Sequence, residues 1–270
     1  MTASISAVIP YFNSSNTLAR ALDSVFRQSF PVREIVVVDD GSRLEDRIRA
    51  EQIVAQYANA RLIVLEANAG PAEARNVGWD NASSDWIAFL DSDDAWHPRK
   101  LEILMSAAAN ARALPDLLAS RTIQVEAYAE FARVEIPEKL PSRWIRTRDL
   151  IVRNRFSTPA VVVRRGLRER FQSGRRFSED YELWLTLAGH GRRLLFVDAP
   201  LAAIFKAPYG ASGLSAQIFS MIWGEYRAYV GAWRARALEP SLMCLGLLGS
   251  TLRSCVRLMR LSLGSFGRRR

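Results

Sequence analysis

Cysteine is scarce in this chain of 270 residues: Cys244 and Cys255 lie near the C-terminus without the spacing of a metal site. We therefore expect no disulfide framework, and a reducing cytoplasmic setting fits the composition best. No uncharged apolar run approaches the roughly 18 residues that a membrane-spanning helix needs. The first residues also lack a basic stretch followed by a long apolar one. We expect neither a signal peptide nor a transmembrane segment.

Two common nucleotide-binding fingerprints are missing as well. No Gly-x-Gly-x-x-Gly follows the first expected strand, and the chain has no Gly-Lys-Ser/Thr of a P-loop. These absences argue against a dinucleotide-binding fingerprint and against a P-loop enzyme. They favour a diphosphate that is held by a metal ion.

Charge is unevenly divided along the chain. Residues 1–132 carry a net charge of −6, whereas residues 133–193 and residues 201–270 each carry +8. An acidic N-terminal half argues against a nucleic-acid partner on that surface. The basic remainder could attract phosphates, anionic lipid or an acidic acceptor. The alternative is genomic composition, because 34 of the 37 basic residues are arginine.

An apolar run that ends in three carboxylates, DWIAFLDSDD, is the most informative stretch of the chain. Residues Trp86–Leu90 are typical of a strand buried on both faces. Asp91, Asp93 and Asp94 then crowd like charges, which repel one another unless a cation lies among them. This arrangement suits Mg²⁺ or Mn²⁺ shared with substrate phosphates. The alternative is an acidic turn in which Asp93 or Asp94 caps a helix that begins near Pro98.

Strand and helix patterns alternate four times before residue 95. Strands are expected at residues 4–10, 34–42, 61–66 and 85–90, with helices at 18–26, 44–57 and 72–78 between them. Such a series predicts a doubly wound parallel sheet with its ligand site beyond the carboxyl ends of the strands. In the strand order 3-2-1-4, the loop after Pro10, the Asp39–Asp40 pair and the acidic cluster would meet at one edge. Further on, we expect a helix at 99–111, one or two strands within 116–135, a buried strand at 156–163 and a helix at 181–188.

Five motifs occur in order along residues 4–215: VIPYFN (8–13), IVVVDDGS (35–42), NAGPAEARNVG (68–78), FLDSDDAWHP (89–98) and SEDYELW (178–184). Together they resemble the motifs of the family 2 glycosyltransferases. The resemblance implies the GT-A fold of nucleotide-diphospho-sugar transferases, an α/β fold with a Rossmann-like, mostly parallel central sheet flanked by helices. It also implies inverting transfer of a sugar from a nucleotide diphosphate sugar to an acceptor hydroxyl.

The same resemblance assigns roles to individual residues. A metal ion, Mg²⁺ or Mn²⁺, would be held by Asp91 and Asp93. The donor site would be built from Pro10, Tyr11, Asn13, Asp39, Gly70, Arg75, Asp91 and Ser92, with Pro10, Tyr11 and Asp39 lining the nucleoside pocket. Lys206 lies in a stretch where many relatives carry an aromatic-Arg pair and a His, and it could serve as a point charge for phosphate.

Asp180 is the candidate general base. An acceptor hydroxyl needs a carboxylate within hydrogen-bond reach to take its proton. The pair Glu179–Asp180 precedes a helical pattern, and the alternative is an acidic first turn that complements the helix dipole. By the resemblance, Asp180 rather than Glu179 acts as the base. Neither His97 nor His190 is assigned to catalysis.

The acceptor is expected to be a lipid-linked or polysaccharide precursor of the cell envelope. The chain lacks the Gln-x-x-Arg-Trp signature and the membrane helices of processive synthases, since Arg143–Trp144 has no preceding Gln. We therefore expect transfer of a single sugar. The basic stretch 164–176 either contacts an acidic or phosphorylated acceptor or is a solvated surface. Two other functions remain open: a nucleotidyltransferase acting on sugar phosphates, and a catalytically silent relative that binds a glycan.

The C-terminal tail carries an apolar stripe at helical spacing, and its residues from 241 onward include six arginines and no acids. The stripe consists of Leu245, Leu248, Leu252, Val256, Met259 and Leu263, with Arg253, Arg257 and Arg260 beside it. Such a helix can lie on the inner face of a membrane as a peripheral contact. The alternative is a helix packed on its own domain or on a second subunit. The expected organisation is thus a donor-binding half (1–110), an acceptor and catalytic-base half of the same domain (111–215), and a basic helical tail (216–270).

Overall fold

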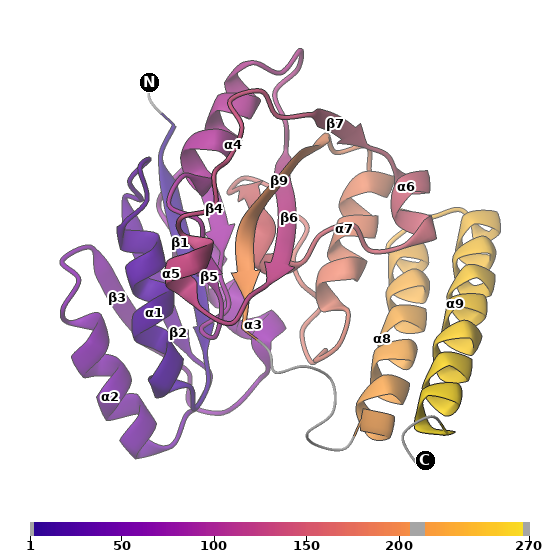
Figure 1. The fold of residues 1–270 in the computed structure, drawn as a ribbon, viewed down its shortest axis with the longest axis horizontal. Helices are drawn as coiled ribbons and strands as arrows, with labels where there is room; N and C mark the ends of the chain where they lie inside the picture. Colours follow the sequence, from indigo (N-terminus) through magenta and orange to yellow (C-terminus); the bar gives the residue numbers. More distant parts are fainter. Residues whose placement is uncertain (1–2, 206–213, 267–270) are drawn as a thin grey trace.

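The structure is a computed structural model that describes residues 3–205 and 214–266 (Figure 1). Its strands are β1 (Ile5–Tyr11), β2 (Glu34–Asp39), β3 (Ala60–Val64), β4 (Trp86–Phe89), β5 (Ala95–Trp96), β6 (Leu117–Gln124), β7 (Ser142–Ile145), β8 (Val161–Arg164) and β9 (Leu194–Ile204). Its helices are α1 (Ser15–Phe26), α2 (Leu44–Val54), α3 (Pro71–Asn81), α4 (Lys100–Ala109), α5 (Tyr128–Phe131), α6 (Thr147–Val152), α7 (Glu179–Gly189), α8 (Leu214–Arg234) and α9 (Pro240–Phe266), with a 3₁₀ turn at Thr158–Ala160.

The described strands form one nine-stranded sheet in the order β3-β2-β1-β4-β8-β6-β9-β5, with β7 paired to β9. The first half confirms the expected order 3-2-1-4, because β1 pairs in parallel with both β2 and β4. Its strands are buried on both faces. In β1, for example, Ile5, Ala7 and Ile9 join the core on one face while Val8 joins the core on the other. This two-sided burial explains why these strands are continuous apolar runs.

The second half of the sheet is mixed. Strand β8 runs antiparallel to both β4 and β6, and β7 and β5 run antiparallel to β9. The α/β class is confirmed, but the expectation of a mostly parallel sheet holds only for the N-terminal half. The segment 116–135 contains β6 and the short helix α5 in place of a second strand. The sheet runs without interruption through both halves of the chain.

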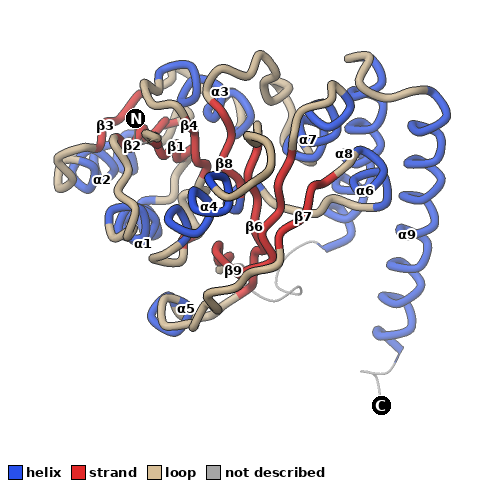
Figure 2. Tube along the Cα trace, turned by 90° about the horizontal axis from the view of Figure 1, so that it is seen from above, coloured by secondary structure: helices blue, strands red, loops and turns tan. Residues whose placement is uncertain are grey.

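Helices cover both faces of the sheet (Figures 1 and 2). Side chains from α1, α2 and α4 pack into one core, whereas those from α3, α6, α7 and α8 pack into the other. The expected inner face of α1 is confirmed at Leu18, Ala21, Leu22 and Val25. It is wrong at Phe26, which is 57% exposed and lies against the ring of Tyr57.

The acidic cluster does not cap the next helix. Strand β5 follows it directly and pairs with β9 through Ala95 and Trp96. Helix α4 begins only at Lys100, and its N-cap residue is Arg99. The expected capping role of Asp94 is therefore wrong, because a short strand occupies the place where a single turn was expected.

Helices α8 and α9 lie side by side at one end of the molecule, and α2 lies at the opposite end (Figures 1 and 2). Helix α9 packs against α8 and α6. In the part of the chain that the structure describes, no helix combines the length and the hydropathy needed to cross a membrane.

Candidate active site

The carboxyl ends of β1, β2 and β4 meet at one edge of the sheet. Tyr11, the last residue of β1, is in register with Asp39, the last residue of β2. On the other side of β1, Val8 is in register with Phe89, so the loop that carries Asp91 leaves the sheet beside Tyr11. The predicted convergence of the donor-site loops is confirmed by this pairing.

The turn after β2 is held to the loop before α3 by Asp40. Its carboxylate accepts hydrogen bonds from the backbone N–H groups of Ala69 (2.7 Å) and Gly70 (2.9 Å) and from the Asn68 amide (3.0 Å). Gly70 has φ of +93°, a conformation that side chains disfavour, and it immediately precedes Pro71 at the first position of α3. This arrangement fixes where α3 begins.

Arg75 connects the donor-site loops to helix α7. It lies one turn into α3 and is buried, and its Nη2 donates to Asp91 Oδ1 at 2.6 Å while its Nη1 donates to Glu179 Oε1 at 2.8 Å. Burial disfavours the charge, but the two carboxylates outweigh it and hold the pKa of the guanidinium above its usual range. The three side chains come from residues 75, 91 and 179, and they form one charged cluster at the edge of the sheet.

Asp180 lies beside this cluster, and although part of the residue is exposed, its carboxyl is surrounded by protein groups. Its Oδ1 accepts the backbone N–H of Tyr181 at 2.7 Å, and Asn154 donates to its Oδ2 at 3.5 Å. Burial, followed by the negative charge of Glu179, raises the pKa of the Asp180 carboxyl to about 7, although Arg75 opposes the rise. Asp180 is thus a carboxylate that can take up a proton near neutral pH.

Asp91 and Asp93 can be tested as metal ligands. Both carboxylates are partly exposed, and only Oδ1 of Asp91 is bonded to Arg75. Within residues 3–205 and 214–266, no three acidic, His or Cys side chains converge to form a complete cage. Magnesium is usually held by one or two carboxylates together with substrate phosphates. The pair therefore fits a divalent cation that shares its coordination with a diphosphate.

Two side chains brace the loop between Asp91 and Asp93. Ser92, a predicted donor-site residue, is buried, and its hydroxyl lies 2.8 Å from that of Ser14. Arg20 donates to the backbone carbonyl of Asp93 at 2.5 Å and stacks over the ring of Phe205 with its Cζ 3.7 Å from the centroid. The loop is thus fixed by α1 and by the end of β9.

The residues predicted to line the nucleoside pocket lie close together, but several have protein partners. Pro10 is buried in β1, and the Tyr11 hydroxyl donates to the carbonyl of Asp46 at 2.9 Å. Asp39 is fully buried and accepts from the Ser42 N–H (2.9 Å) and from Arg47 (3.3 Å). Asn13 is another predicted donor-site residue. Its side-chain oxygen accepts the N–H of Arg43, and its own N–H donates to the Ser42 hydroxyl. These residues shape the turn after β2, and their contacts with a nucleoside stay a prediction.

Sequence reasoning missed the roles of Glu179, Asp40 and Arg20. Glu179 stood next to the predicted base, but its bond to Arg75 joins residues that are 104 positions apart. Such a pair has no local pattern. Asp40 was recognised only as the second acid of the Asp39–Asp40 pair. The sequence hint that its carboxylate binds backbone N–H groups is the glycine-containing loop at 68–70, which lies about 30 residues further along the chain.

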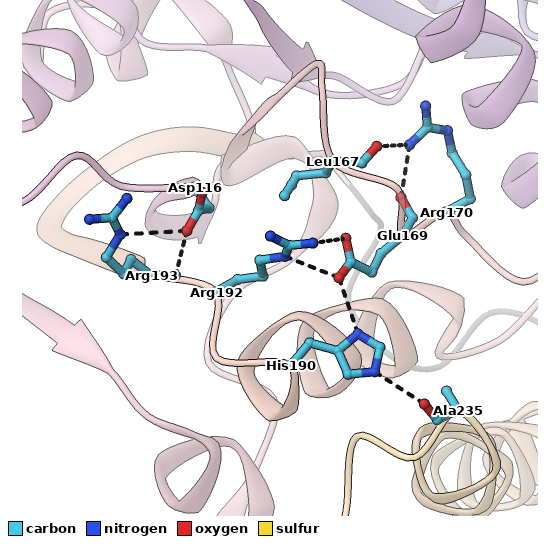
Figure 3. Close-up of polar contacts among 8 residues, drawn as sticks. All are labelled: Asp116, Leu167, Glu169, Arg170, His190, Arg192, Arg193 and Ala235. Atoms are coloured by element: carbon cyan, nitrogen blue, oxygen red, sulfur yellow. Dashed lines mark hydrogen bonds and ion pairs between the residues drawn. The ribbon is translucent and has the colours of Figure 1, made fainter.

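The basic stretch 164–176 is engaged with neighbouring protein groups at many of its arginines. Arg164 stacks on Trp86, Arg175 pairs with Glu182, and Arg176 donates to Asn68. Arg170 donates to the backbone carbonyls of Leu167 and Glu169 (Figure 3). These contacts describe a packed surface and weaken the alternative of an acceptor-binding stretch.

The two histidines have hydrogen-bond partners within the protein. His190 follows α7 and lies between the Glu169 carboxylate and the carbonyl of Ala235, each at 3.1 Å (Figure 3). His97 is buried, with Nε2 3.0 Å from the carbonyl of Val134, and burial lowers its pKa. The predicted phosphate contact of Lys206 lies outside the described residues.

A model of the family "Glycosyl transferase family 2" matches residues 6–165. The chain is similar to the succinoglycan biosynthesis protein ExoO of Rhizobium meliloti, with 32% identity over 201 residues that cover 70% of this chain and 57% of that protein. It is also similar to the UDP-Glc:alpha-D-GlcNAc-diphosphoundecaprenol beta-1,3-glucosyltransferase WfgD of Escherichia coli, with 35% identity over 102 residues covering 38% of this chain and 40% of WfgD. The chain thus spans about half the length, or less, of these two relatives.

Among solved structures, the fold is similar to that of the mannosyltransferase PcManGT from Pyrobaculum calidifontis in complex with GDP-Man and Mn²⁺. The TM-score is 0.64 at 16% identity, and the match covers 98% of this chain and 81% of PcManGT. At this identity the similarity establishes the fold alone, and it agrees with the sheet and helix arrangement described above.

Proposed function

The chain belongs to glycosyl transferase family 2, and on that premise we propose that it transfers one sugar from a nucleotide diphosphate sugar to a hydroxyl of a glycan or lipid-linked acceptor, with inversion and with a divalent metal. The names of the relatives support the nucleotide-sugar donor, the class of acceptor and the divalent metal. ExoO is a succinoglycan biosynthesis protein, and the name of WfgD states a UDP-Glc donor and a diphosphoundecaprenol-linked acceptor. PcManGT was solved with GDP-Man and Mn²⁺.

The observation that carries the proposal is the Arg75 bridge between Asp91 and Glu179. It holds the predicted donor-binding carboxylate at a fixed place relative to the first turn of α7, where Asp180 lies. A donor on Asp91 and Asp93 would therefore have a candidate base close by. Because a general base works best when its pKa lies near the operating pH, the raised pKa of Asp180, about 7, suits this role.

The proposed reaction is a single displacement at the anomeric carbon. The acceptor oxygen forms a bond to that carbon while the bond from the carbon to the diphosphate oxygen breaks on the opposite side, which inverts the configuration. The acceptor proton passes to the carboxylate of Asp180, and the nucleoside diphosphate leaves with the electron pair. A divalent ion held by Asp91 and Asp93 would neutralise the charge that develops on the diphosphate.

Donor binding can be tested by thermal unfolding with UDP-, GDP- and dTDP-sugars, each with and without Mn²⁺. A ligand that binds only the folded state raises the Tm, and at a hundred times its Kd the shift should be about 5 °C or more. We expect one nucleotide class to stabilise the protein only when Mn²⁺ is present. Asp93→Ala should abolish that shift, while Asp198→Asn, an exposed residue paired with Arg121, should retain it.

The product of turnover separates the proposed function from a nucleotidyltransferase. Incubation with the stabilising donor and a panel of glycan and lipid-linked acceptors should release a nucleoside diphosphate. Release of pyrophosphate from a nucleoside triphosphate and a sugar phosphate would overturn the proposal. Metal-dependent donor binding without turnover on any acceptor would favour a silent glycan-binding relative.

A further inference from the structure

Helix α9 presents its apolar stripe to solvent. Leu245, Leu248, Leu252, Val256 and Met259 are between 37% and 69% exposed. The opposite side of the helix makes the contacts with the protein: Gly246 packs on the ring of Tyr229, and Ser250 is fully buried. The predicted stripe therefore exists, but it is not the surface by which α9 packs on its own domain.

Helix α8 adds an aromatic stripe. Phe219, Trp223 and Trp233 are 62%, 60% and 41% exposed, and their spacing of four and ten residues places them on one side of the helix. Arg227 and Arg234 are exposed in the same part of α8. Aromatic rings beside arginines are typical of the boundary between lipid and water, where the ring is half-immersed and the guanidinium reaches the headgroups.

The charge of this region is mostly positive, and Glu225 and Glu239 are the acidic residues within 214–270. Residues 241–270 include six arginines and no acidic residue. The acidic side chain within residues 219–234 is Glu225, and it pairs with Arg253, which also donates to the carbonyl of Val152. Arg253 thus fastens α9 to α8 and α6 and is not free to meet a partner. The side chains of Arg257, Arg260 and Leu263 lie outside the described residues.

An anionic surface complements this charge, whereas a second copy of the chain does not. In a two-fold symmetric contact the same patch faces itself, so a positively charged patch would face an equally positive one. Headgroups of anionic lipids attract arginines that lie near the membrane surface. Exposed leucines and tryptophans next to them can enter the acyl boundary.

The α8 end of this surface is close to the candidate base. Gly224 packs directly on Phe177: a Cβ at Gly224 would lie 2.8 Å from the Cβ of Phe177. Phe177 is 41% exposed and precedes Asp180 by three residues. The aromatic stripe of α8 therefore begins beside the loop that leads into the first turn of α7.

We propose that the exposed sides of α8 and α9 form a peripheral binding surface for an anionic lipid bilayer. The apolar side chains of both helices lie in the acyl boundary, and the arginines lie among the headgroups. Docking in this way brings the edge of the candidate active site to the lipid surface, where a lipid-linked acceptor would be found. Binding to lipid does not depend on the transfer reaction, so each can fail without the other.

Co-sedimentation of the full chain with vesicles tests this surface. The vesicles consist of phosphatidylcholine alone or of phosphatidylcholine mixed with phosphatidylglycerol, at low and at high salt. We expect binding to the anionic vesicles that weakens with salt. Leu248→Ser/Leu252→Ser and Arg227→Gln/Arg234→Gln should each weaken it by about tenfold or more.

The matched control is Leu44→Ser/Ile48→Ser on α2, which removes two exposed apolar side chains at the same spacing from the opposite end of the molecule. It should bind vesicles like the unchanged chain, and circular dichroism should show that all variants are folded. Equal binding of the control and the α9 variant would overturn the proposal. So would a dimer in light scattering that Leu248→Ser/Leu252→Ser dissociates while neither protein binds vesicles.

Discussion

Arg75 and Glu179 set the electrostatic environment of Asp180. The negative charge of Glu179 raises the pKa of the Asp180 carboxyl, and the positive charge of Arg75 lowers it. Because Glu179 and Arg75 are hydrogen-bonded to each other, both charges act on Asp180 from one place. Burial makes the largest contribution. A base in this position is protonated below neutral pH and becomes able to accept a proton as the pH rises through about 7.

Glu179→Gln should therefore move the acid limb of the pH profile of kcat/KM to lower pH. In the unchanged enzyme, activity should rise as the pH passes about 7, where Asp180 loses its proton. Removal of the neighbouring negative charge stabilises the ionised form of Asp180 and lowers this pKa. The measurement is the rate of nucleoside diphosphate release across pH 5–9.

Glu182→Gln serves as the control, because Glu182 lies on the same helix but pairs with Arg175. Its acid limb should coincide with that of the unchanged enzyme. An acid limb that moves to higher pH in Glu179→Gln would contradict the assignment, and so would one that does not move.

The position of Lys100 in helix α4 buries a side chain that normally carries a charge. It is the first residue of α4 and is fully buried, with Nζ 3.0 Å from the carbonyl of Pro159 and 3.9 Å from the centre of the Trp96 ring. Burial holds the pKa of this amine well below its usual range. The Lys100 amine therefore binds a proton less readily in the folded chain than in the unfolded chain. Below the pKa of the unfolded lysine, this difference lowers the free energy of unfolding.

Lys100→Met should raise the free energy of unfolding at neutral pH, and the gain should shrink as the pH rises towards 10. The thioether fills a similar volume, and Trp96 still donates to the Pro159 carbonyl. The difference between the two proteins should fall by at most about 1.4 kcal/mol per pH unit. Urea unfolding at several pH values measures it.

Lys139→Met, at an exposed position, is the control and should show no such trend. A gain in Lys100→Met that is the same at every pH would contradict the proposed cost of burying the amine. A loss of stability at neutral pH would do so as well.

The elements that sequence reasoning predicted well are those with a strong local pattern. Strands β1, β2 and β4 are apolar because both their faces are buried, and α9 is amphipathic. Strand β5 has only two residues, and the first three residues of β7 are exposed, so neither strand forms a recognisable apolar run. Their positions, and the antiparallel direction of β8, depend on pairing with residues far along the chain.

The candidate site likewise contains residues that the sequence could predict and contacts that it could not. Asp91, Asp93 and Asp180 stood in recognisable motifs, and the structure places all three at the same edge of the sheet. The bridge that Arg75 makes to Glu179, and the loop that Asp40 organises, are long-range contacts without a sequence signature. For α9, the pattern predicted an apolar stripe but could not show which side packs on the domain, because that depends on Tyr229 and Glu225 of α8.

One continuous sheet joins the two predicted halves of the domain. The loop that carries Asp91 follows β4 in the donor-binding half, whereas Asp180 begins a helix of the other half, and Arg75 ties the two regions together. The predicted donor-binding residues and the candidate base are thus held by different elements around one continuous sheet. Removing the base should therefore leave the donor site intact.

Asp180→Asn tests this division most directly, because amide and carboxylate have nearly the same shape. Mn²⁺-dependent donor binding, measured by calorimetry, should match that of the unchanged protein, while transfer to the acceptor should fall by about 10²–10⁴-fold. Transfer at the original rate would contradict the assignment of Asp180 as the base, and loss of donor binding together with transfer would contradict the separation of the two sites.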